Sequence, residues 1–144
     1  MHPLPHQYTV DARAGATGSV QLCGDGLPAI MCAPPAQFGG PGDQWSPEDL
    51  LIGAVADCFV LSFRAIARAS KLEWSHLECR VDGTLDRVEG VTRFVGMTVH
   101  ARLTAPAGTS RDKAERLLAK AENSCLVSNS LACEIGLETE LLTG

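Results

Sequence analysis

The sequence contains no cluster of basic residues. Its 12 Lys and Arg residues are outnumbered by 17 Asp and Glu residues, which gives a formal net charge of −5. Proteins that bind nucleic acids usually present a basic face to the phosphate backbone. A nucleic-acid partner is therefore not expected.

Long apolar segments are missing as well. The longest apolar stretch covers residues 50–63 and is interrupted by Asp57, whereas a membrane span needs about 20 consecutive apolar residues. We interpret this stretch as a buried core helix and expect no membrane partner. Residues 1–10 carry neither the positive region nor the apolar core of a secretory signal, so a cytoplasmic location is expected.

The sequence also lacks the usual metal and nucleotide motifs. There is no C-x-x-C pair, and the four histidines, His2, His6, His76 and His100, are not spaced as zinc ligands. Neither a P-loop nor a strand-linked G-x-G-x-x-G occurs. We therefore expect no metal site and no cofactor.

Turn residues and apolar periodicity predict a single α+β domain over residues 1–144. Ser46-Pro47-Glu48-Asp49 is a strong helix start, and the helix should run to about residue 70 with apolar residues on more than one side. Before this helix, the pattern predicts short strands at 8–10, 19–23 and 29–32 and a loop at 33–45. After it, the pattern predicts a hairpin of strands 77–85 and 95–103 around Glu89-Gly90. A second helix should start at residues 109–112, and a last strand should cover 133–141.

Six cysteines are present, and in a reducing compartment a free cysteine is usually a small buried apolar residue. This interpretation suits the strand-like positions of Cys23, Cys32, Cys79 and Cys133. Cys58 lies in the middle of the apolar helix, where burial should raise the pKa of its thiol.

Cys125 is more suggestive of chemistry. If Ser124 caps a new helix, Cys125 lies in its first turn, where the helix dipole favours a thiolate. Spacing alone leaves open whether Cys58 and Cys125 meet.

Two segments carry a family resemblance. S-P-E-D-L-L at residues 46–51, followed by A-D-C-F at 56–59, resembles the N-P-E-x-L…A-x-C-F signature of the OsmC/Ohr family. That family comprises the osmotically inducible protein C and organic hydroperoxide resistance proteins. A-E-N-S-C-L-V-S-N-S-L at residues 121–131 resembles its second motif, A-E-x-x-C-P-V-S-x-x-L.

The resemblance implies an OsmC-like fold, with antiparallel sheets wrapped around a long buried helix in an intertwined homodimer. It implies a peroxidase of the oxidative stress response that reduces organic hydroperoxides. Cys58 is then the cysteine that attacks the peroxide, and Cys125 the one that resolves its sulfenic acid as a redox-active disulfide. Glu48 would orient the family's active-site Arg, and an external dithiol would reduce the disulfide.

The sequence departs from the family pattern at two points. The family keeps its active-site Arg at one of two positions, depending on the subgroup. The first position is occupied here by Thr17, and the second falls in the region of Gln37 and Phe38. Neither position holds Arg, so Arg13 is the candidate for stabilising the thiolate. Leu126 replaces the motif's Pro.

The missing Arg keeps a second function open: an OsmC-like redox sensor or small-molecule binding protein with little turnover. A purely structural dimer is the third alternative.

Four aromatic residues are candidates for an apolar substrate pocket: Phe38, Trp45, Phe59 and Phe63. Packing in the core is an equally good interpretation of these residues.

Overall fold

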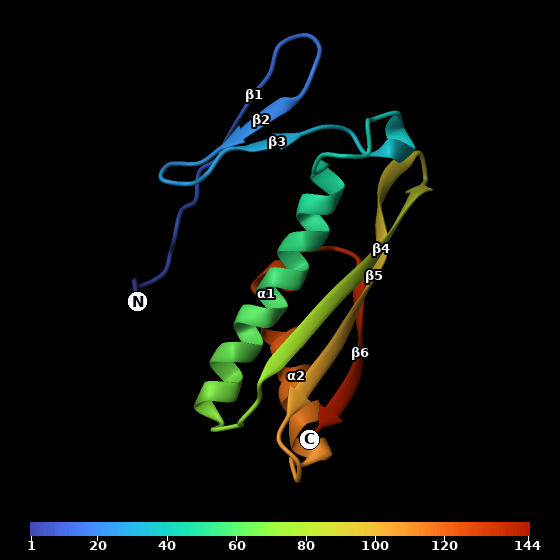
Figure 1. Cartoon of the computed structure of the whole chain (residues 1–144). Helices are drawn as coiled ribbons and strands as arrows, with labels where there is room; N and C mark the ends of the chain where they lie inside the picture. Colours follow the sequence, from blue (N-terminus) through green and yellow to red (C-terminus); the bar gives the residue numbers. More distant parts are fainter. The chain divides into compact units, whose positions relative to one another are not determined.

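The computed structural model describes residues 1–144 and separates them into two units, residues 1–51 and 52–144. The first unit holds a three-stranded antiparallel sheet in the order β1-β2-β3 (Figure 1). Its strands are β1 (Asp11–Arg13), β2 (Val20–Cys23) and β3 (Ile30–Cys32), followed by a short 3-10 helix, η1 (Ala36–Phe38). The expectation of one domain over 1–144 stays a prediction.

Helix α1 (Pro47–Ala69) begins where the sequence predicted. The Asp49 N–H donates to Ser46 Oγ at 3.0 Å, while the Ser46 hydroxyl donates back to Asp49 Oδ2 at 2.9 Å. This reciprocal cap satisfies backbone and side-chain donors at the first turn, and it fixes the point at which the chain becomes helical.

Burial of α1 is narrower than expected. Its fully buried residues follow one stripe at four-residue spacing: Val55, Phe59, Phe63 and Ala67. Leu61, on another face, is 59% exposed. The expectation that the helix is buried on more than one side is therefore wrong for the single chain. By length and composition alone, α1 could cross a membrane, a property that core helices of soluble proteins share.

The second unit is built on a sheet in the order β4-β5-β6. β4 (His76–Val88) and β5 (Val91–Ala105) form the predicted antiparallel hairpin. Its turn residues Glu89 and Gly90 both have positive φ, 51° and 80°, as the tight turns that suit twisted hairpins require.

The last strand, β6 (Glu134–Thr143), pairs parallel to β5. The chain leaves β5, crosses through α2 (Arg111–Ser124) and α3 (Leu126–Asn129), and re-enters the sheet in the same direction. The second sheet is thus mixed, whereas purely antiparallel sheets were expected. The cap of α2 is Ser110, which accepts from the Lys113 N–H and lies within the predicted 109–112 start.

One face of this sheet forms the core. On β5 the inward side chains are buried at alternate positions, from Val99 to Ala105, and α1 and α2 lie on this side of the sheet (Figure 1). Phe59 and Phe63 are fully buried, and Phe63 packs edge-on against Trp74 at 5.4 Å between ring centroids. These two aromatics therefore form core and do not line a substrate pocket.

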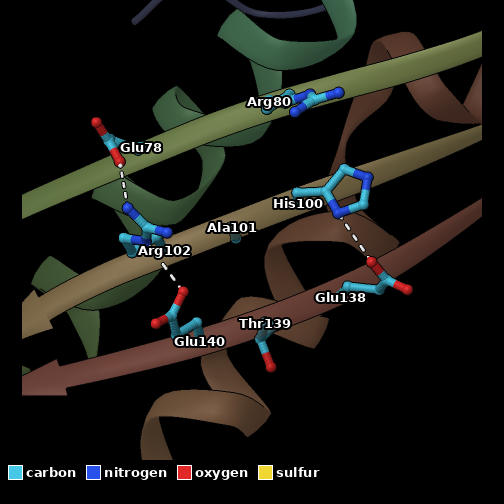
Figure 2. A pocket seen from close by; sticks show the side chains of 8 residues that line it. All are labelled: Glu78, Arg80, His100, Ala101, Arg102, Glu138, Thr139 and Glu140. Carbon is cyan, nitrogen blue, oxygen red and sulfur yellow. Dashed lines mark hydrogen bonds and ion pairs between the residues drawn. The ribbon is translucent and has the colours of Figure 1, made fainter.

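The opposite face of the sheet is charged. Arg102 on β5 bonds Glu140 of β6 at 3.0 Å and Glu78 of β4 at 3.5 Å, and His100 bonds Glu138 of β6 at 2.8 Å. Figure 2 shows these pairs around a shallow hollow on the sheet surface. Because exposed ion pairs contribute little to stability, they support the three-strand register more than the overall stability.

Candidate active site

The two motif cysteines lie together in the second unit. Cys58 sits in the middle of α1, and Cys125 occupies the junction between α2 and α3. Their thiols are near enough for each to shift the pKa of the other, and both are free of disulfides. The structure thus brings together two residues that sequence spacing could not place side by side.

The break between α2 and α3 positions Cys125. Cys125 has extended backbone angles, φ −66° and ψ 107°, and it both ends α2 and caps α3. Its N–H donates to the Glu122 carbonyl at 3.2 Å, and its carbonyl accepts from the Asn129 N–H at 2.9 Å. The extended backbone of Cys125 therefore separates the two helices at this residue.

The surroundings of Cys58 favour its thiolate. Burial raises the pKa of the thiol, but the backbone N–H of Val127, the Cys125 thiol, the Ser62 hydroxyl and the backbone N–H of Leu126 outweigh it, so that the pKa is lowered. The Ser62 oxygen lies 4.0 Å from the sulfur. Burial acts in the predicted direction, but the prediction of a raised pKa for Cys58 is wrong because the net shift is downward. Hydrogen-bond donors, and not a basic side chain, produce the shift.

Cys125 behaves in the opposite way. Burial raises the pKa of its thiol, and Cys58 raises it further, while the Ser128 side chain and backbone partly oppose the change. The sequence predicted a thiolate at Cys125 in a helix capped by Ser124. Ser124 instead ends α2, and the first N–H groups of α3 act on Cys58. The thiolate is thus favoured at Cys58.

Two further polar side chains lie beside Cys125. Burial raises the pKa of Glu122, and Ser128 partly opposes that shift. Glu122 Oε2 and Ser128 Oγ are both shielded from solvent, yet neither forms a hydrogen bond of regular geometry. The sequence pattern predicted no role for either residue, although both lie within the second motif three residues from Cys125.

Cys79 on β4 faces the same region. Burial raises the pKa of Cys79 to about 11, with added effects from the charges of Glu122, Cys125 and Asp57. At neutral pH it therefore remains a thiol. This agrees with the expectation that Cys79 is a packed apolar residue.

Glu48 and Arg13 belong to the first unit. Glu48 lies in the first turn of α1, and its Oε1 is buried without a hydrogen bond. Arg13 is exposed on β1, opposite Gln21 of β2. Phe38 and Trp45 are exposed, at 58% and 55%. The roles of Glu48 and Arg13 in the site stay predictions.

Comparison with known proteins identifies the family. Residues 40–140 match the model of the OsmC-like protein family. An organic hydroperoxide resistance protein from Xanthomonas axonopodis pv. citri is 28% identical over 125 residues, which cover 85% of this chain and 86% of that protein.

Solved structures agree with this assignment. An OsmC-like protein of unknown function from Vibrio cholerae superposes with a TM-score of 0.85 at 16% identity, over 94% of this chain and 99% of the other. An organic hydroperoxide resistance protein from Legionella pneumophila gives 0.76 at 26% identity, over 97% and 99%. With the mixed α+β fold shared and both cysteine motifs inside the matched range, the chain belongs to the OsmC-like protein family, the OsmC/Ohr family that those motifs indicated.

Proposed function

We propose that this protein is a cysteine peroxidase that reduces organic hydroperoxides in the cytoplasm. One observation carries the proposal: two neighbouring thiols have pKa values shifted in opposite directions, lowered at Cys58 and raised at Cys125. Such a pair supplies a thiolate that can react first and a thiol held in reserve beside it. The names of the Xanthomonas and Legionella relatives agree with a peroxide substrate.

The chemistry begins at Cys58. Its thiolate attacks one oxygen of the hydroperoxide, so that an S–O bond forms, the O–O bond breaks, and the alkoxide leaves as an alcohol after taking up a proton. Cys58 is then a sulfenic acid. Because Cys58 is only partly buried while Cys125 is fully buried, a peroxide meets Cys58 first.

Cys125 completes the oxidation. Its sulfur attacks the sulfenic sulfur, an S–S bond forms, and the hydroxyl group leaves as water with the proton that Cys125 gives up. The resulting disulfide protects Cys58 from irreversible oxidation. An external dithiol then returns both cysteines to thiols by exchange.

We also propose a homodimer and a role for the unpartnered Glu48 carboxylate. Apolar side chains that one chain leaves open, such as Leu61 at 59% and Leu126 at 70% exposure, would be covered by a second copy. The buried Glu48 Oε1 would hold a guanidinium, for which Arg13 is the candidate.

A turnover assay tests the proposed activity. Reduced protein is mixed with cumene hydroperoxide and dithiothreitol, and the loss of peroxide is followed. We expect repeated turnover by the wild type and by Cys133→Ser, and none by Cys58→Ser. Turnover no faster than that of Cys58→Ser would overturn the peroxidase proposal and favour the redox sensor or binding protein.

A further inference from the structure

A carboxylate and a hydroxyl lie buried beside the Cys125 thiol without regular hydrogen-bond partners. Glu122 precedes Cys125 by three residues in α2, and Ser128 follows it by three residues in α3. Glu122 Oε2 and Ser128 Oγ are both shielded from solvent and unpaired. Folded proteins leave few buried polar atoms unpaired, so each such atom calls for an explanation.

Ser128 lies between the other two groups. Its side chain is close to the Cys125 thiol on one side and to the Glu122 carboxylate on the other. Ser128 is buried and Cys125 is fully buried, so bulk water has no direct access to the Cys125 sulfur. A hydroxyl can accept one proton while donating another, and therefore Ser128 can connect the thiol to the carboxylate.

The other titratable groups facing this region are poor proton acceptors for Cys125. Cys58 of α1 is the sulfur that Cys125 must attack, and Cys79 of β4 remains a thiol because burial raises its pKa to about 11. Asp57 of α1 acts on Cys79 and is itself exposed to solvent. Glu122 is thus the carboxylate beside the thiol that has an oxygen shielded from solvent.

We propose that Glu122, acting through the Ser128 hydroxyl, accepts the proton of the Cys125 thiol when Cys125 attacks an oxidised Cys58. Ser128 gives its own proton to Glu122 and takes the one from the thiol, and the S–S bond forms as the group on Cys58 leaves. In the peroxide cycle that group is the hydroxyl, which leaves as water with the proton returned from Glu122. The proposal rests on the redox role proposed above for this cysteine pair.

The electrostatics of both groups support the transfer. Burial raises the pKa of Cys125, which therefore needs a base at neutral pH, and burial also raises the pKa of Glu122, which makes its carboxylate a better base. Glu122 acts on the reacting sulfur only through Ser128 and is thus a positioning residue, whereas Ser128 is a direct neighbour of the thiol, whose pKa it lowers.

The test uses a disulfide reagent and no peroxide. In the full chain, Cys23, Cys32, Cys79 and Cys133 are replaced by Ala, and the protein is mixed with 5,5′-dithiobis(2-nitrobenzoic acid). Cys58 attacks the reagent and releases a first coloured thiolate. Cys125 then attacks the Cys58 sulfur and releases a second one, and the rate of this second release measures the activation of Cys125.

We expect Glu122→Gln to slow the second release at least about 100-fold, the lower end of the range for loss of a general base, and to leave the first release unchanged. Glu122→Asp should restore part of the rate. Glu115→Gln is the matched control, because Glu115 lies exposed on the same helix. Ser128→Ala should resemble Glu122→Gln, while Ser124→Ala, at the exposed end of α2, should resemble the wild type.

The pH profile separates proton transfer from a purely structural role. In the wild type, the second release should slow as the pH falls through the raised pKa of Glu122, and this limb should be absent in Glu122→Gln. A second release as fast in Glu122→Gln as in Glu115→Gln at every pH would overturn the proposal, as would a wild type that releases only one equivalent. If both releases occur at normal rates but the protein does not turn over peroxide, the result would count against the peroxidase function alone.

Discussion

The sulfurs of Cys58 and Cys125 lie together but have different surroundings. Cys58 receives backbone N–H groups from the start of α3, whereas Cys125 is fully enclosed. Because the thiolate is the reactive form of cysteine, this difference assigns an order to the two residues. In the proposed cycle, Cys58 therefore reacts first, and Cys125 reacts with the product.

Alkylation should reveal this order. At pH about 8, iodoacetamide is expected to modify Cys58 before Cys125 because the pKa is lowered at Cys58 and raised at Cys125. Cys79, with a pKa of about 11, would hold only about one thiolate in a thousand and should react last of the three. Timed quenching with peptide mass spectrometry measures the order. Modification of Cys125 or Cys79 ahead of Cys58 would contradict the assignment.

Leu126 supplies a donor that the family motif lacks. The motif has Pro at this position, and Pro has no N–H, whereas the Leu126 N–H helps to lower the pKa of Cys58. Leu126→Pro should therefore raise the Cys58 pKa, because a hydrogen bond that favours the thiolate is lost. The pH dependence of Cys58 alkylation measures this shift.

The fold should tolerate this substitution. Proline is favoured at the first position of a helix, the preceding Cys125 already has the extended backbone that proline requires, and the Leu126 side chain is 70% exposed. Leu126→Ala keeps the N–H and is the matched control. An equal pKa in Leu126→Pro and Leu126→Ala would show that this donor does not act on Cys58.

Glu122 should lower the stability of the folded protein at neutral pH. An unfolded Glu has a pKa of about 4.3, and burial raises the value in the folded chain. Between these two values the folded state binds more protons, so the stability falls as the pH rises through that window. Glu122→Gln is therefore expected to raise Tm at pH about 7.5 and to lose this advantage near pH 4.

Thermal melts of Glu122→Gln and Glu115→Gln at both pH values provide the measurement. A Glu122→Gln variant less stable than the wild type at pH about 7.5 would mean that the carboxylate makes a stabilising contact. If Glu122→Gln is more stable than the wild type but slows the attack of Cys125 on Cys58, then Glu122 serves function at the expense of stability.

At the scale of elements, α1 is held close to β4 at a glycine. A Cβ on Gly83 would lie 2.4 Å from Ile52 Cδ1 and 3.2 Å from a ring carbon of Phe94. Gly83→Ala should therefore force the Ile52 side chain to move and lower the unfolding free energy, by less than the about 1–3 kcal/mol of overpacking in a closed core, because the clashing atom ends a flexible side chain. Chemical denaturation measures the loss.

A double variant makes this prediction specific. Ile52→Val removes the clashing Cδ1, so Gly83→Ala should cost less in the Ile52→Val background than in the wild type. Gly136→Ala is the control, because no atom lies within 4 Å of its added Cβ. Equal costs in the two backgrounds would mean that α1 does not pack here as described.

Elements with local signals were predictable from the sequence. Ser46-Pro47 and the following acids marked the start of α1, and Glu89-Gly90 marked the hairpin turn, because caps and tight turns are set by a few adjacent residues. The parallel pairing of β6 was not predictable in this way. It depends on the path of the chain through α2 and α3, and strand periodicity is the same for both directions.

In the candidate site, too, local sequence signals were predictable and tertiary contacts were not. Two motifs identified Cys58 and Cys125, but their contact depends on how α1 packs against the α2–α3 junction. The sign of the Cys58 pKa shift was missed for that reason, since the donors that lower it come from Leu126 and Val127, far away in the sequence. Glu122 and Ser128 were visible in the motif, yet only their burial gives them a possible role.

At the scale of the whole molecule, the open apolar surface of α1 predicts self-association. Sedimentation equilibrium should give twice the 15.2 kDa mass of one chain. Leu61→Glu, at an exposed position of α1, should shift the protein toward the monomer because it places a charge in the proposed interface. Leu142→Glu, at an exposed position near the end of β6, is the control. A wild type that stays monomeric at high concentration would contradict the dimer.

The central claim is that Cys58 and Cys125 work as an ordered redox pair. The most direct test is a peptide mass map of the reduced protein after one equivalent of cumene hydroperoxide, taken without a reducing agent. An ordered pair should give a Cys58–Cys125 disulfide in the wild type and a trapped Cys58 sulfenic acid in Cys125→Ser. Unmodified cysteines, or a disulfide that joins other residues, would contradict it.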